Sequence, residues 1–180
     1  MDNQTIQNKL TGEQITFLES VKDNGGVRSV LKFKVEPKAN VPLHYHNSFD
    51  EKFEVVDGEL SVVTGKTKVK LKKGETATAY KTVRHRYLNE SSDVTEFLVT
   101  ISPGNLHVEN MFKIYCGLAN DGQSNKQGIP KSPFVMGLMM ELGESRLTGW
   151  MTLASPLLKW LAGSARKKGI DKILYDKYCK

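Results

Sequence analysis

The sequence predicts a mainly β fold followed by a helical C-terminal region, on three observations. Short runs between residues 27 and 102 alternate apolar and polar side chains, which is the pattern of strands with one buried face. Turn signals such as Asp57-Gly58 separate these runs. After Pro103-Gly104 the apolar residues recur with the period of a helix. With 180 residues, the chain is long enough for one domain with a substantial core.

The expected strands are short and closely spaced, which is typical of a β-barrel or a β-sandwich. The clearest run extends from Val27 to Val35, with Leu31 and Phe33 on the same face. Two weaker runs, 5–9 and 14–20, predict an N-terminal hairpin or an added edge strand, and residues 23–26 predict a turn. Further strands are expected at residues 59–64, 66–71, 76–80, 84–89 and 95–102.

A row of lysines lies on one face of the expected strand at 66–71 and continues just beyond it: Lys66, Lys68, Lys70 and Lys72. Such a row could bind phosphate. It is also typical of an exposed strand, where charge discourages pairing with another sheet edge. We favour the second interpretation.

Helices are expected throughout residues 105–180. A stripe of apolar residues at helical spacing begins at Val108. Ser132-Pro133 and Ser155-Pro156 each predict an N-cap followed by proline at the first helical position. These signals place helices at 133–142 and 156–168, and a last short helix at 171–178. We expect residues 1–104 to form the β-barrel with its N-terminal strands, and 105–180 to be a helical extension packed on it within the same structural unit.

The net charge of +6 is concentrated in this C-terminal region, where residues 105–180 carry 11 basic and 6 acidic side chains. We interpret them as a solvated surface and expect no nucleic-acid partner, because no nucleic-acid motif or interleaved aromatic residues accompany them. The uncharged run 147–158 is too short to span a bilayer. We favour its packing on the barrel or at a homodimer interface over a membrane surface, although Trp150, Trp160 and the basic tail suit interfacial binding.

Two of the four histidines, His44 and His46, are two residues apart. On a strand both imidazoles therefore point to one side. Glu51 follows after four residues, enough for the chain to bend back toward the pair. His85 lies after another strand-like run. Three imidazoles and one carboxylate make a ligand set suited to a transition metal.

The spacing of these residues resembles the two motifs of the cupin family. The first motif is His44-x-His46, four residues, Glu51, six residues and Gly58. The second is Gly74, ten residues, His85, three residues and Asn89. Fifteen residues separate the motifs, and the resemblance covers roughly residues 25–104. At the turn positions the chain departs from the family pattern: Lys38 replaces a glycine, and Tyr80 and Thr82 replace the ends of a Pro-x-Gly.

The resemblance implies a double-stranded β-helix, the jelly-roll-like cupin barrel, holding one divalent transition metal. Its implied ligands are His44, His46, Glu51 and His85, and the metal is Fe, Mn, Ni, Cu, Co or Zn. The implied partner is a small organic molecule. The first functional hypothesis is an enzyme, a dioxygenase similar to the quercetin dioxygenase-like cupins, although an isomerase or a lyase would use the same ligands. The alternatives are a non-catalytic cupin that binds a small ligand and a membrane-surface or scaffold protein.

Within this site we assign roles to further residues. Glu51 is the candidate catalytic base as well as a ligand. Phe53, Val55 and Tyr87 have the same inward parity as the ligands and are candidates to line a substrate pocket. His107 matches no motif position and is not expected to bind metal. The N-terminal residues show no signal peptide, so we expect a cytoplasmic protein.

Overall fold

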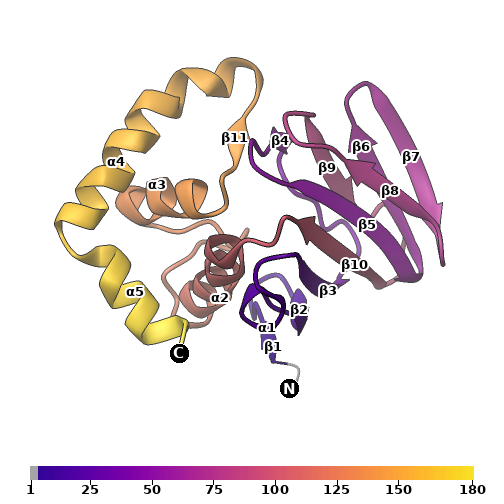
Figure 1. Ribbon diagram of the computed structural model, residues 1–180, viewed down its shortest axis with the longest axis horizontal. Helices are drawn as coiled ribbons and strands as arrows, with labels where there is room; N and C mark the ends of the chain where they lie inside the picture. Colours follow the sequence, from indigo (N-terminus) through magenta and orange to yellow (C-terminus); the bar gives the residue numbers. More distant parts are fainter. Residues whose placement is uncertain (1–3) are drawn as a thin grey trace. The chain divides into compact units, whose positions relative to one another are not determined.

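The computed structural model describes residues 4–180 (Figure 1). The chain divides into two compact units. The β unit contains the described residues up to Gln7 together with Gly12–Leu106, and the helical unit contains Asn8–Thr11 and His107–Lys180. A mainly β fold with a helical C-terminal region is thereby confirmed.

The β unit is built from two antiparallel sheets. The first has the order β1 (Thr5–Gln7), β2 (Gln14–Glu19), β3 (Ser29–Val35), β10 (Thr95–Ser102), β5 (Asp50–Asp57) and β8 (Thr76–Ala79). The second contains, as neighbours in this order, β4 (His44–Tyr45), β9 (His85–Leu88), β6 (Glu59–Thr64) and β7 (Thr67–Lys72).

The core of the β unit lies between the two sheets. Side chains alternate between buried and half-buried along β3, so the predicted face with Leu31 and Phe33 is the inner one. Phe97 of β10 lies opposite Phe33 in the register, and the rings stack with centroids 5.4 Å apart. Tyr87 of the second sheet packs against Phe97 at 5.0 Å and Phe33 at 6.4 Å. These aromatic contacts hold the sheets together and support the strands that carry the histidines.

The lysine row lies on β7, the last strand of its sheet in the described part of the chain. Lys68 forms an ion pair with Glu90 at 2.7 Å, and Lys70 forms one with Glu59 at 3.0 Å. Two of the four cations are therefore already neutralised. This arrangement agrees with the charged edge strand that we favoured over a phosphate site.

One segment of the β unit differs from the prediction. Residues 21–24 form a short helix, α1 (Val21–Asn24), where the sequence predicted a turn over 23–26. A capping box explains it: Ser20 accepts a hydrogen bond from a backbone N–H of the first turn, and the Asp23 side chain accepts one from the Ser20 N–H.

The helical unit contains most of α2 (Leu106–Asn120), followed by α3 (Pro133–Leu142), β11 (Arg146–Leu147), the 3-10 helix η1 (Gly149–Ala154), α4 (Ser155–Lys167) and α5 (Ile170–Tyr178). Its core is formed by Ile114, Leu118, Leu138, Leu142, Ala165 and Leu174. Ser132 caps α3 as predicted. The N-cap prediction for Ser155 is wrong, because η1 runs directly into α4 and Ala154 takes the N-cap position. In the described part of the chain, no helix combines the length and apolar character needed to cross a membrane.

Gly137 sets the close approach of α3 to α4. A Cβ atom there would lie 2.7 Å from the Leu158 carbonyl oxygen and 2.9 Å from the Ala162 nitrogen, both backbone atoms that cannot rotate away. We expect Gly137→Ala to lower the free energy of unfolding by about 1–3 kcal/mol through overpacking.

Gly163 of α4 is the matched control, because a Cβ atom there would meet nothing within 4 Å. Gly163→Ala should instead raise the free energy of unfolding by about 1 kcal/mol through helix propensity. Urea unfolding of both variants measures the two effects. Equal effects of the same sign would contradict the close approach.

Candidate metal centre

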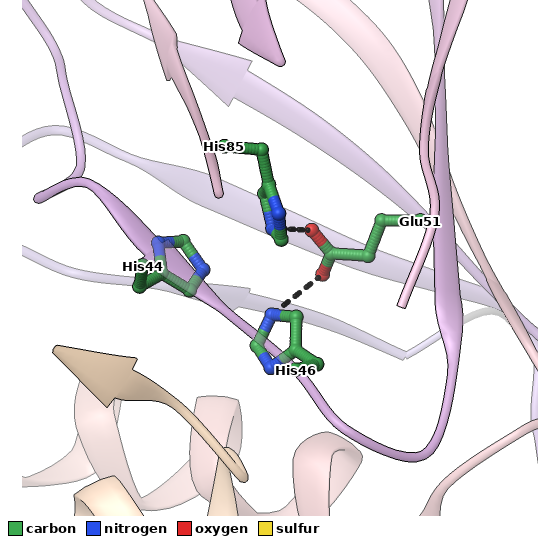
Figure 2. A group of neighbouring side chains, drawn as sticks. All are labelled: His44, His46, Glu51 and His85. Atoms are coloured by element: carbon green, nitrogen blue, oxygen red, sulfur yellow. Dashed lines mark ion pairs between the residues drawn. The ribbon is translucent and has the colours of Figure 1, made fainter. Parts of the chain in front are cut away.

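Four side chains of the β unit converge on one point. One possible ligand atom from each of His44, His46, Glu51 and His85 lies within 4.8 Å of the others (Figure 2). His44 and His85 are direct register partners on β4 and β9 of the second sheet, and His46 follows β4. Glu51 comes from β5 of the first sheet, so the cluster bridges the two sheets.

Backbone carbonyls fix the orientation of two of the imidazoles. The Nδ1 atom of His44 lies 2.7 Å from the Pro42 oxygen, and Nδ1 of His85 lies 2.9 Å from the Val83 oxygen. In each pair the ring N–H donates to the carbonyl, which leaves Nε2 as the atom that faces the cluster. Metal-binding histidines commonly have their other nitrogen held in this way.

The carboxylate of Glu51 lies between two of the rings. One of its oxygens, Oε2, is 3.0 Å from Nε2 of His85, and the other, Oε1, is 3.7 Å from Nε2 of His46 (Figure 2). His46, Glu51 and His85 are buried, whereas His44 is half-buried. His44 is therefore the most exposed side chain of the four.

The charges of these groups depend on one another. Burial alone would raise the pKa of Glu51, but the hydrogen bond with His85 and the charges of the nearby imidazoles outweigh it and lower the pKa to about 2. Burial lowers the pKa of His44. Burial also acts to lower the pKa of His85, but the contact with Glu51 outweighs it and the pKa is raised. Glu51 is thus an anion at neutral pH and faces nitrogen donors, as a cation site requires.

A short turn at residues 80–83 supports both sides of the cluster. The Thr82 N–H donates to the His46 carbonyl at 2.6 Å, and the Val83 carbonyl accepts from the His85 ring. At the same turn the Lys81 N–H donates to the Asp50 carboxylate at 2.7 Å, next to Glu51 in the chain. The sequence did not reveal these bonds.

The departures from the family's turn pattern leave the turns intact. Lys38 and Thr82, which stand where the family has glycine, adopt positive φ angles of 69° and 67°. The chain therefore keeps the left-handed conformation at both positions, although only glycine adopts it without strain. A β-branched residue such as Thr82 is strained most.

We therefore expect Thr82→Gly to stabilise the protein by about 1 kcal/mol, because the exposed threonine side chain adds little there and the strain is relieved. Thr76→Gly, at the exposed start of strand β8, is the control and should destabilise by about 0.5–1 kcal/mol. Thermal unfolding of both variants tests this. Destabilisation by Thr82→Gly would show that the turn depends on the threonine itself.

The candidate pocket residues Phe53, Val55 and Tyr87 are all buried in the β unit. Phe53 lies nearest to the cluster, with its ring centroid 6.4 Å from that of His85. Tyr87 packs among the core aromatics, and its hydroxyl donates to Glu13 at 3.0 Å. Their role in contacting a substrate stays a prediction.

Two further residues have roles in the geometry of the site. Phe49 is buried and stacks on His46 with centroids 4.3 Å apart, a contact hidden in a segment that the sequence marked only as a bend. Asn89, a position of the second motif, is buried and closes the turn after β9. Its side-chain amide donates to the Asp93 and Glu36 carbonyls at 2.8 and 3.2 Å. His107 belongs to the helical unit and is not part of the cluster.

The donor set fits a divalent transition metal. Three imidazoles and a carboxylate are intermediate donors that suit iron, manganese, nickel, copper, cobalt and zinc alike. The oriented Nε2 atoms and the ionised Glu51 are the features that such a site needs. The donor set does not select one metal among these.

Residues 31–101 match the family model described as "Cupin domain". No curated protein matches the sequence. Among solved structures, a predicted oxalate decarboxylase from Thermotoga maritima is 21% identical with a TM-score of 0.50, covering 56% of this chain and 90% of that one. An RmlC-like cupin from Shewanella frigidimarina is 17% identical with a TM-score of 0.50, covering 58% of this chain and 87% of that one. At these identities the likeness shows the fold.

Proposed function

Because this chain is a member of the cupin superfamily, with its cupin domain at residues 31–101, we propose that it is a metal-dependent enzyme acting on a small organic molecule. The proposed ligands are His44, His46, Glu51 and His85, and the proposed reaction is a dioxygenation. The observation that carries the proposal is the convergence of the four ligand atoms within 4.8 Å.

A divalent metal bound there would supply a Lewis acid and a template for a chelating substrate. The residues of the chain would orient the ligands, exclude water and take up a proton. Carbonyl contacts hold His44 and His85 in the tautomer that binds through Nε2. Phe49 stacks on His46 and, with Phe53, keeps water away from the buried side of the site. Glu51 is the proposed base: its contacts with the imidazoles hold its pKa low, so it would take up a substrate proton on a carboxylate oxygen once the substrate displaces these contacts.

Metal binding should depend on pH in a defined direction. Glu51 raises the pKa of His85, so protons compete with a metal for this ring up to a higher pH than for an ordinary histidine. Below that pKa the proton competes, and the metal affinity should fall as the pH is lowered. Glu51, with a pKa of about 2, stays ionised and adds nothing to this trend. Calorimetric titration with zinc at several pH values measures it, and an affinity that is constant between about pH 5 and 8 would contradict it.

Oxygen uptake tests the enzymatic part of the proposal. The metal-free protein is reconstituted separately with iron, manganese, nickel, copper, cobalt and zinc and offered flavonoids, diketones and thiols. We expect uptake with at least one combination and none from His85→Ala protein. Binding of a compound without turnover, seen as a thermal shift that needs the metal, would favour the non-catalytic ligand-binding alternative and overturn the enzymatic one.

A further inference from the structure

An exposed apolar surface runs along η1 and α4. Leu153, Leu157 and Trp160 are 83%, 57% and 62% exposed. Leu157 and Trp160 are three residues apart on α4, so they lie on one side of this helix, and Leu153 precedes them in η1. The adjoining side of α4 is buried through Leu161, Ala162 and Ala165, and Leu161 follows Leu157 by four residues. The apolar surface of α4 is therefore wider than the part used in the core of the helical unit, and Leu157 and Trp160 lie on its exposed part.

Helices α4 and α5 carry several lysines in addition to this apolar surface. Lys159, Lys167 and Lys172 form no ion pair with any residue that the structure describes. Arg166 and Lys177, in contrast, pair with Glu141 and Asp121, each at 2.6 Å. Over residues 155–180 the chain carries seven basic and two acidic side chains. A strong positive field thus accompanies the exposed leucines and tryptophan.

We propose that this surface, defined as the α4 face by Leu153, Leu157, Trp160 and Lys167, docks on an anionic lipid surface. An amphipathic helix binds at the interface by placing apolar side chains among the acyl chains, with tryptophan at headgroup level. Lysines then contact the negative headgroups.

The charge distinguishes this occupant from a second copy of the chain. A two-fold interface places the same surface patch of both copies together. The lysines of both copies would then be brought to one interface, where like charges repel. An anionic surface complements the same lysines. The sequence favoured packing of this region within the protein or a dimer, and the exposure of Trp160 and the two leucines leads us to the different proposal. The proposed docking on lipid does not depend on the metal site.

Vesicle co-sedimentation of the full chain tests the proposal. The vesicles contain phosphatidylcholine alone or phosphatidylcholine mixed with phosphatidylserine. We expect binding to the mixed vesicles only, weakening as salt is raised. Lys167→Gln should weaken binding about fivefold. Lys66→Gln and Lys73→Gln, which remove exposed charge from the β unit, are matched controls and should change binding little.

A second pair of variants separates the apolar contribution from charge. The double variant Leu157→Ser, Trp160→Ser should abolish binding. The control Val27→Ser, Tyr80→Ser removes apolar side chains that are 68% and 62% exposed on the β unit and should leave binding intact. Absence of binding to the mixed vesicles would overturn the proposal. In that case, a dimer that dissociates in the Leu157→Ser, Trp160→Ser variant, measured by sedimentation equilibrium, would identify a second copy of the chain as the occupant of this face.

Discussion

His85→Ala is expected to abolish stoichiometric metal binding while the protein stays folded. The ring of His85 contacts Glu51 at 3.0 Å and lies beside His44 at a centroid distance of 4.5 Å, so its loss removes one ligand and the partner of another. Changes outside the ligand shell already cost about 10–100-fold in affinity, and loss of a ligand should cost more. Alanine at His44, His46 or Glu51 should act in the same direction. Metal analysis of the purified variants measures the effect.

His107→Ala is the control for these variants. His107 lies in the helical unit, so the metal content of the His107→Ala variant should equal that of the unmodified protein. Circular dichroism shows whether each variant keeps its strands, which rest on an apolar core. Metal loss in His107→Ala together with full metal in His85→Ala would refute the ligand assignment.

Glu51→Gln should reduce turnover far more than metal affinity. The amide keeps the size of the side chain and an oxygen donor but removes the negative charge and the basicity. General-base catalysis contributes typically about 10²–10⁴-fold, so the rate should fall within that range in metal-loaded protein. Turnover and bound metal are measured on the same preparation, with the substrate found by oxygen uptake.

Glu54→Gln is the matched control on the same strand. Glu54 points away from the core, is 41% exposed and pairs with Lys52, so its replacement should leave the rate unchanged. Full activity in metal-loaded Glu51→Gln protein would rule out the role as a base and leave Glu51 as a ligand.

Much of the fold follows from the period of the apolar residues. The alternation through Leu31 and Phe33 predicted β3 and its inner face, because a strand with one buried side leaves that pattern. The proline at the start of α3 marked the helix start because its missing N–H costs nothing there. Ser155-Pro156 gave the same local signal, but the 3-10 helix η1 continues into α4 and no separate N-cap is needed.

The convergence of these four side chains could be predicted because spacing controls direction on strands. His44 and His46 share a side, and the bend before Glu51 brings it to them, as expected. The supporting turn could not be predicted. Thr82 adopts a conformation that its residue type disfavours, and its bond to the His46 carbonyl is made by the backbone, which leaves no side-chain signal. The stacking of Phe49 on His46 likewise depends on the shape of the bend.

The most direct test of the metal centre is anomalous diffraction from crystals of the metal-loaded protein, recorded above and below the absorption edge of the metal. We predict one strong peak among His44, His46, Glu51 and His85, about 2.0–2.2 Å from an atom of each side chain. The absence of a peak there, or a peak on other residues, would contradict the proposed centre.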